Sequence, residues 1–148
     1  TWKSNKGFVY DINNFKLLDD FNIYGQGWGL TNDGKSLILS DGSEKIYYLN
    51  PKNFQIEKTI SVSVNGNKLI YINELEFIRG EIWANIWKSN DIITVNPLSG
   101  IVTSIFDISK ISEQTEIEDV ANGIAWDKVN DKIFITGKNW NFIYLLDI

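Results

Sequence analysis

The sequence predicts an all-β fold, and three observations carry this prediction. Apolar residues alternate with other residues at a period of two through most of the chain, which is typical of strands. The helical period is nearly absent. Turn sequences such as Asp33-Gly34 and Asn130-Asp131 separate the apolar segments. At 148 residues, the chain is long enough for one domain with a substantial core.

A hairpin in residues 73–87 is the clearest single element. Its two strands alternate apolar and other residues, and Arg79-Gly80 forms the reversal between them. Asn73 and Glu74 stand where the first strand begins, and Trp87 stands where the second strand ends. In an antiparallel hairpin these two ends lie side by side, opposite the turn. The hairpin therefore predicts that an amide, a carboxylate and an indole meet at one place.

The same unit of strands recurs along the chain. Asn50-Pro51 and Asn96-Pro97 each follow a short apolar strand, and the two pairs are 46 residues apart, from Asn50 to Asn96. The expected strands are 7–11 and 15–21 in a half copy; 27–31, 36–40, 46–49 and 54–60 in the first full copy; 73–78, 81–86, 92–95 and 102–108 in the second; and 122–126, 132–136 and 142–147 in the third, which has no fourth strand. Residues 108–119 are expected to form a short helical turn or a loop.

A four-stranded meander repeated every 40 to 50 residues or so predicts a β-propeller. The expected units are a half blade in residues 1–23, blades in 24–61 and 69–108, and an incomplete blade in 119–148. About three blades do not close a ring, because propellers typically have at least four. We therefore expect the chain to be the C-terminal part of a larger protein, with the remaining N-terminal blades as its partner. The alternative is a β-sandwich in which the spacing is coincidental.

Composition excludes several classes of function. The formal net charge is −5, and Arg79 is the single arginine, so we expect no nucleic-acid partner, which would need a basic surface. No apolar run of about 18 residues is present, so no membrane span is expected, and no signal peptide is expected at the start of the chain. Cysteine and histidine are absent, which leaves no disulfide, no thiol nucleophile, no Ser-His-Asp triad and no zinc site of the usual kind.

Several unusual residues fall at equivalent positions of the repeat. In a propeller blade, the start of the inner strand and the end of the second strand lie on the same face. The residues expected to surround this mouth of the channel are Trp2, Trp28, Asn73, Glu74, Trp87, Asn122 and Lys138. Each also has an ordinary structural interpretation. A tryptophan can pack against its neighbours, an asparagine can satisfy the backbone of a loop, a glutamate can be a buried hydrogen-bond acceptor, and a lysine can extend into solvent. Together they predict a pocket with a polar floor and aromatic walls for a small group that carries an amine or an amide.

Six motifs that contain these residues resemble the plant and bacterial glutaminyl cyclases (glutamine cyclotransferases). In order along the chain they are Gly25-Gln26-Gly27-Trp28-Gly29-Leu30-Thr31-Asn32-Asp33-Gly34, Ser40-Asp41-Gly42, Asn73-Glu74-Leu75-Glu76, Trp83-Ala84-Asn85-Ile86-Trp87, Asn122-Gly123-Ile124-Ala125 and Thr136-Gly137-Lys138-Asn139-Trp140. The resemblance runs nearly end to end, and six linked motifs are far more specific than any one of them.

The resemblance implies a five-bladed propeller that converts N-terminal glutamine of peptides, or free glutamine, to pyroglutamate with release of ammonia. It implies no metal and no cofactor. By motif, Asn73 and Lys138 correspond to the family's active-site asparagine and lysine, and Trp2, Trp28 and Trp87 to its pocket tryptophans. Glu74 and Asn122 are expected beside them as substrate-binding residues.

The resemblance also places the family's catalytic glutamate in the N-terminal blades, before the stretch that corresponds to Thr1. Glu74 is not expected to take the role of that catalytic glutamate. We therefore expect the 148-residue chain alone to be inactive. The bacterial members suggest a periplasmic or secreted location.

Two other functions stay open. A non-catalytic propeller could use the same pocket to bind a peptide N-terminus or serve as a scaffold. A six-bladed lactonase-like hydrolase would need a metal in the channel, and Asn73, Glu74 and Asn122 supply only part of its ligand set.

Overall fold

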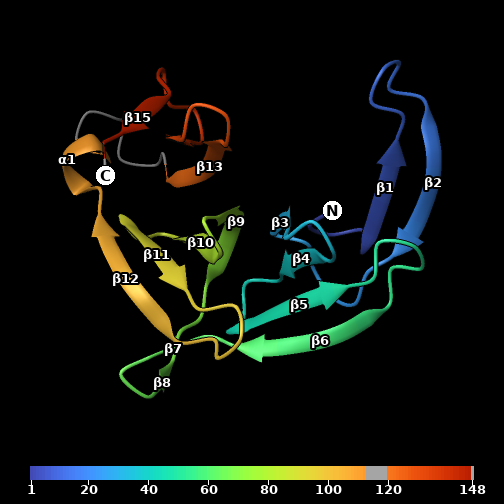
Figure 1. Cartoon of the computed structure of the whole chain (residues 1–148), viewed down its shortest axis with the longest axis horizontal. Coiled ribbons are helices and arrows are strands. Elements are labelled where there is room, and N and C mark those ends of the chain that lie inside the picture. The colour runs from blue at the N-terminus through green and yellow to red at the C-terminus, as the bar shows by residue number, and fades with distance from the viewer. Residues whose placement is uncertain (113–119, 148) are drawn as a thin grey trace.

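The computed structural model describes residues 1–112 and 120–147, and nearly all of its regular structure is antiparallel β-sheet (Figure 1). A two-stranded sheet consists of β1 (Lys6–Tyr10) and β2 (Leu17–Asn22). A four-stranded sheet follows, with β3 (Gly29–Asn32), β4 (Leu37–Ser40), β5 (Lys45–Leu49) and β6 (Ile56–Ser61). The second four-stranded sheet has β9 (Ile72–Ile78), β10 (Glu81–Ile86), β11 (Asp91–Val95) and β12 (Val102–Asp107). A three-stranded sheet has β13 (Ala121–Asp127), β14 (Lys132–Gly137) and β15 (Tyr144–Leu146).

In each of these sheets the strands pair in sequence order, as in a meander. The β9–β10 hairpin illustrates the local cause. Ile78 pairs with Glu81, and the two turn residues, Arg79 and Gly80, have φ angles of 50° and 88°. Positive φ at both central residues gives the turn that matches the right-handed twist of the strands. The predicted hairpin is therefore present in the structure.

The sheets follow one another around an arc, in the way that blades of a propeller do (Figure 1). The first strands of successive sheets are neighbours, because β9 contacts β3 on one side and β13 on the other. Gly29 in β3 makes the first of these contacts possible. A Cβ atom at this position would lie 2.2 Å from the carbonyl oxygen of Asn73, which no real side chain tolerates. Both junctions between inner strands therefore run close to Asn73 and its neighbours in β9.

The core lies between the sheets in two clusters. The first joins the sheets β3–β6 and β9–β12 and includes Ile38, Ile46, Ile72 and Ile82, all fully buried. The second joins the sheets β9–β12 and β13–β15 and includes Ile78, Ile92, Ile133 and Ile135. Burial of aliphatic side chains between adjacent sheets is the main force that holds such repeats together.

One element differs from the sequence-based expectation, and another agrees with it. A short hairpin of β7 (Ser63–Val64) and β8 (Asn67–Lys68) lies between the two four-stranded sheets, in a segment for which no strand is predicted. The helix α1 (Ser109–Ser112) is a single turn in the segment where a helical turn or loop is expected. The rest of that prediction, residues 113–119, lies outside the described residues. The blade boundaries at 1–23, 24–61, 69–108 and 119–148 stay a prediction.

Candidate active site

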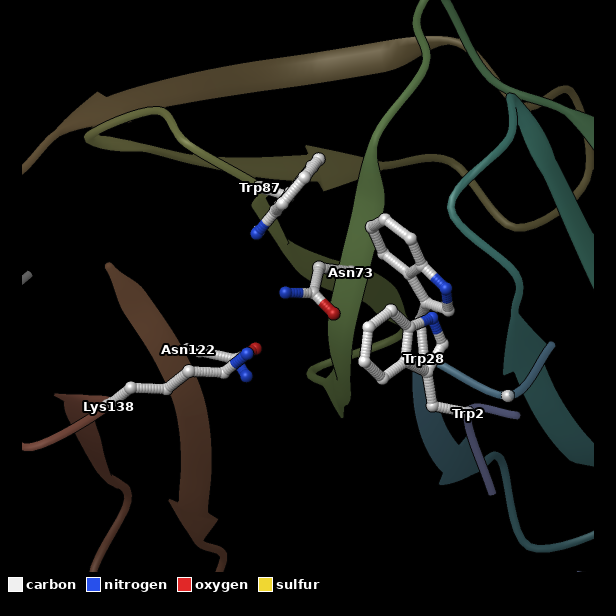
Figure 2. A pocket seen from close by; sticks show the side chains of 7 residues that line it. Trp2, Trp28, Asn73, Trp87, Asn122 and Lys138 are labelled. Carbon is white, nitrogen blue, oxygen red and sulfur yellow. The ribbon is translucent and has the colours of Figure 1, made fainter. Parts of the chain in front are cut away.

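A pocket of about 220 Å³ lies where the inner strands begin. Its lining residues are Trp2, Gly27, Trp28, Asn73, Trp87, Asn122 and Lys138. The structure therefore brings together six of the seven residues expected at the mouth, although they are spread over most of the chain (Figure 2). Glu74, the seventh, is not among the lining residues.

The repeat explains why these residues meet. Asn73 is the second residue of β9, and Asn122 is the second residue of β13. Trp87 directly follows β10, and Lys138 directly follows β14. Since starts of first strands and ends of second strands share one edge in an antiparallel meander, equivalent positions of successive sheets converge on the pocket.

Asn73 provides the polar floor. The residue is 5% exposed, and its side chain points into the pocket (Figure 2). Its backbone is held from the neighbouring sheet: the Ser40 hydroxyl donates a hydrogen bond to the Asn73 carbonyl oxygen at 2.5 Å and accepts one from the Gly29 amide at 2.8 Å. Ser40 is fully buried. The side-chain amide of Asn73 is thus presented on a backbone that a second sheet fixes.

Asn122 lies on the opposite side of the pocket, beside Lys138 (Figure 2). Its Oδ1 atom is buried and has no hydrogen-bond partner within the described residues. The adjacent Gly123 amide donates to Oδ1 of Asn85 at 3.0 Å, and Asn85 Nδ2 is also buried without a partner there. Unsatisfied buried polar atoms are rare in folded proteins. Their concentration beside the pocket is consistent with a polar ligand or ordered water.

Lys138 supplies a cation to the pocket. Its backbone amide donates to the carbonyl of Val120 at 3.0 Å, which fixes the start of its side chain. Its ammonium group points toward the centre of the pocket (Figure 2). The ion pairs found among the described residues are Lys6–Asp20, Lys68–Glu44 and Arg79–Asp131, and none of them includes Lys138. An ammonium group without a carboxylate partner is available to bind an oxygen atom of a ligand.

The aromatic wall is a connected series of rings. Trp28 meets Trp87 edge-on, with ring centroids 5.4 Å apart and an interplanar angle of 82°. Trp87 in turn meets Tyr71 at 5.7 Å, and the Trp87 amide donates to the Tyr71 carbonyl at 2.9 Å. Edge-to-face packing is a favourable geometry for aromatic rings. Trp2 completes the wall beside Trp28 (Figure 2).

Glu74 lies between two inner strands. Its Oε2 atom accepts a hydrogen bond from the Ile124 amide at 3.0 Å. The pKa of Glu74 is raised to about 8, chiefly by burial and to a smaller extent by the nearby Glu76 carboxylate, against the opposing effect of hydrogen bonds from the Ile124 and Leu75 amides. Because side chains alternate along a strand, Glu74 faces β13 while Asn73 faces the pocket. Its place in the structure is that of a connector between strands.

Three functionally placed residues escape sequence reasoning: Ser40, Asn85 and Gln26. Oε1 of Gln26 accepts hydrogen bonds from the indole nitrogens of both Trp2 and Trp28. All three lie inside the motifs quoted above, but no pattern in the sequence indicates their partners.

Two further observations concern ligands and membranes. Within residues 1–112 and 120–147, no three acidic side chains gather in a way that could hold a metal ion. In the same part of the chain, no helix has both the length and the apolar character needed to cross a bilayer.

Successive antiparallel sheets around an arc, with a pocket where their inner strands begin, define a protein of the β-propeller class. The fold also matches designed proteins: a crystal structure of the computationally designed Ika8 protein aligns over 97% of this chain with a TM-score of 0.53 and 14% identity. The family is more specific. A family model described as glutamine cyclotransferase matches residues 1–148, and the chain belongs to this family.

Two relatives give the extent of the similarity. A protein of Arabidopsis thaliana named glutaminyl-peptide cyclotransferase is 37% identical over 153 residues, which cover 99% of this chain and 48% of the relative. The crystal structure of the Myxococcus xanthus glutaminyl cyclase aligns with a TM-score of 0.90 and 30% identity, over 99% of this chain and 67% of that one. The chain thus spans about half the length of the curated relative.

Proposed function

We propose that this chain is part of a glutaminyl-peptide cyclotransferase, which converts N-terminal glutamine of peptides, or free glutamine, to pyroglutamate and ammonia. The observation that carries the proposal is the pocket itself. It places an amide and an ammonium group opposite an aromatic wall, in a chain whose named relatives are glutaminyl cyclases.

In the proposed reaction, the substrate α-amine attacks the carbon of its own side-chain carboxamide. A C–N bond forms, the carboxamide oxygen becomes an oxyanion, and the bond to the amide nitrogen then breaks. One proton leaves the attacking amine and one is delivered to the departing nitrogen, which is released as ammonia. Lys138 and Asn73 are placed to donate hydrogen bonds to the oxyanion. Trp2, Trp28 and Trp87 would hold the substrate in the folded conformation that brings amine and carbonyl together, and Asn122 would bind it from the opposite side.

The proton transfer needs a further group. Among residues 1–112 and 120–147, none that lines the pocket carries a carboxylate, and Glu74 is directed at β13. We therefore propose that the shuttling carboxyl group comes from a part of the protein outside this chain, in the remaining N-terminal blades. The reaction as proposed needs neither a metal nor another cofactor.

The sheets support the proposal of additional blades. The β1–β2 sheet has two strands and the β13–β15 sheet has three, whereas the two sheets between them have four. An apolar cavity of about 240 Å³ separates β1–β2 from β3 and β4, and Phe21, Leu30 and Leu39 are among its lining residues. Inner strands of the half blade would fill this space. On the family's example, we also propose that the protein acts in the periplasm or outside the cell.

The test is ammonia release from a peptide with N-terminal glutamine by the intact polypeptide that contains this chain. Asn73→Ala and Lys138→Ala should each lower kcat/KM by about a hundredfold or more, which is typical for loss of one oxyanion donor. Lys132→Ala, at the exposed far end of β14, is the matched control and should keep the wild-type rate. Equal activity of all four proteins would contradict the assigned roles. Binding of the peptide without cyclisation would favour the non-catalytic propeller.

A further inference from the structure

One amide oxygen connects two tryptophans of the aromatic wall of the pocket. Oε1 of Gln26 accepts a hydrogen bond from Nε1 of Trp2 at 2.6 Å and another from Nε1 of Trp28 at 2.8 Å. The two tryptophans are far apart in sequence and reach the pocket from different segments. Gln26 lies in the loop before β3, with Gly25 (φ 80°) before it and Gly27 after it.

Chemistry fixes the orientation of this amide. An indole N–H is only a donor, while a carboxamide oxygen has two lone pairs and can accept two hydrogen bonds. The oxygen of Gln26 must therefore face the two indoles, because the opposite orientation would place its amide protons against theirs. The observed arrangement uses the full acceptor capacity of a single oxygen atom.

The hydrogen bonds also determine which part of each indole faces the pocket. In Figure 2 the nitrogen atoms of Trp2 and Trp28 lie close together on the side away from Asn73. The six-membered rings consequently face the interior. Free rotation of either ring would carry a polar N–H into the aromatic wall and would change the shape of the pocket.

Trp2 depends most on this contact. It is 57% exposed, and the ammonium group of Lys3 lies 4.4 Å from its ring centroid. Trp28 has additional support, since it meets Trp87 edge-on and a Cβ atom on Gly42 would lie within 2.6 Å of its ring. Gln26 thus ties the less constrained indole to the more constrained one.

We propose that Gln26 is a positioning residue that holds Trp2 and Trp28 together as one wall of the substrate pocket. It need not touch the reacting atoms. The consequence for catalysis rests on the proposed function, because it requires the pocket to bind the glutaminyl substrate. The consequence for the tryptophans follows from the geometry alone.

Two substitutions at this position test the hydrogen bonds without a large effect on folding. Gln26→Glu keeps an oxygen that can accept from both indoles, while Gln26→Ala keeps none. Gln26 is exposed, so neither change should alter the thermal midpoint substantially. The experiment records the indole N–H signals of the intact polypeptide by ¹⁵N NMR, with Trp2→Phe and Trp28→Phe to assign them, and measures cyclisation of a glutaminyl peptide in parallel.

We expect Gln26→Ala to shift the signals of Trp2 and Trp28 and leave that of Trp83, which is buried in the core, unchanged. It should lower kcat/KM about tenfold, the equivalent of one lost net hydrogen bond of about 1.4 kcal/mol. Gln26→Glu should keep both indole signals in the hydrogen-bonded range and restore most of the activity. Unshifted indole signals in Gln26→Ala, or equal behaviour of the two variants, would overturn the proposal. A wild-type protein that does not cyclise glutamine would contradict the proposed function, while the indole signals would still decide whether Gln26 holds the two rings.

Discussion

Asn73 and Glu74 are neighbours in β9 with opposite surroundings. The amide of Asn73 faces the pocket, whereas the carboxylate of Glu74 accepts from the Ile124 amide across the junction with β13. Glu76, two residues further on, repeats the pattern, because its carboxylate accepts from the Trp126 amide at 3.3 Å and from the Thr31 hydroxyl at 3.0 Å. In β9, Asn73 therefore serves the pocket, while the two carboxylates join the strand to its neighbours β3 and β13.

The raised pKa of Glu74 predicts a pH-dependent stability. Its ordinary pKa is 4.5, and in the folded protein burial raises it to about 8. Between these values the unfolded chain has released the proton that the folded protein retains, so the free energy of unfolding falls as the pH rises. One unit of pKa corresponds to about 1.4 kcal/mol, and since burial of the group is incomplete we expect a loss of roughly 2 kcal/mol. Urea unfolding of the intact polypeptide from pH 5 to pH 9 measures it.

Glu74→Gln should remove most of this dependence, because the amide oxygen can still accept from Ile124 and carries no charge. The variant should be more stable than the wild type at pH 9. Glu57→Gln, at an exposed position of β6, is the control and should keep the wild-type slope. If Glu74→Gln loses as much stability with rising pH as the wild type, another group is responsible.

At the level of elements, the junction between β3 and β9 is the closest approach near the site. Gly29 and Ser40, which pair across β3 and β4, together present a small surface and one hydroxyl to the Asn73 carbonyl. The position of the pocket floor thus depends on two residues of the neighbouring sheet that do not line the pocket.

Ser40→Ala should destabilise the protein by roughly 2 to 3 kcal/mol. The substitution leaves the Gly29 amide and the Asn73 carbonyl, both buried with Ser40, without their shared partner, and an unmet buried polar group costs about 1 to 3 kcal/mol. Ser104→Ala, at an exposed position of β12, should change stability by less than about 0.5 kcal/mol. Chemical denaturation measures both, and a similarly small effect at the two positions would show that the Ser40 bridge contributes little.

Gly29→Ala tests the close approach itself. The added methyl group would lie 2.2 Å from the Asn73 carbonyl oxygen and 2.8 Å from the Glu74 Cα atom, so β3 and β9 must separate at a cost of roughly 3 kcal/mol. Gly66→Ala is the informative comparison. It has φ of 79° and open space around it, so it introduces backbone strain of about 1 kcal/mol without a clash. The urea midpoint should fall much further for Gly29→Ala, and the reverse order would mean that the two strands can separate at little cost.

The sequence predicts most elements because strands and turns leave local patterns. All four strands of each full sheet lie within a few residues of their expected positions, and the Arg79-Gly80 reversal is where the pattern places it. The sequence also contains a local signal for the β7–β8 hairpin, since Asn65-Gly66 between Val64 and Leu69 is a typical hairpin turn. The contacts of Ser40, Asn85 and Gln26 have no such local signature. The contacts Gln26–Trp2, Ser40–Asn73 and Asn85–Gly123 join residues 24, 33 and 38 positions apart, and only the packed sheets determine them.

At the scale of the whole molecule, the pocket belongs to no single sheet. Its lining comes from the segments before β1 and β3, from β9 and β13, and from the residues that follow β10 and β14. The relative positions of these sheets are fixed by side chains buried between them. The geometry of the pocket is consequently a property of several packed sheets, and any disturbance of their packing should reach the site.

The isolated chain and the intact polypeptide should differ in how they associate. Residues 1–148 produced alone should associate with themselves, because large apolar side chains are exposed in and beside the sheets β1–β2 and β13–β15. These two sheets lie at the ends of the arc (Figure 1). The exposed side chains include Phe8, Tyr10, Phe142 and Leu145, which are 44%, 52%, 66% and 53% exposed. Exposed apolar strand edges promote association. Light scattering should show a mass that grows with concentration and the dye ANS should bind strongly, whereas the intact polypeptide should show neither behaviour.

Leu145→Lys should have different effects in the isolated chain and in the intact polypeptide. In the isolated chain, a charge on β15 should reduce association, because charged residues protect sheet edges. In the intact polypeptide the same change should lower the free energy of unfolding by roughly 2 kcal/mol, because the side chain is then buried against the strands that complete the ring. Less association of the isolated chain together with lower stability of the intact polypeptide is expected only if Leu145 is exposed in the first and buried in the second. An isolated chain that is monomeric and does not bind the dye, together with a harmless Leu145→Lys in the intact polypeptide, would mean that these surfaces are natural exteriors and that the pocket does not need further blades.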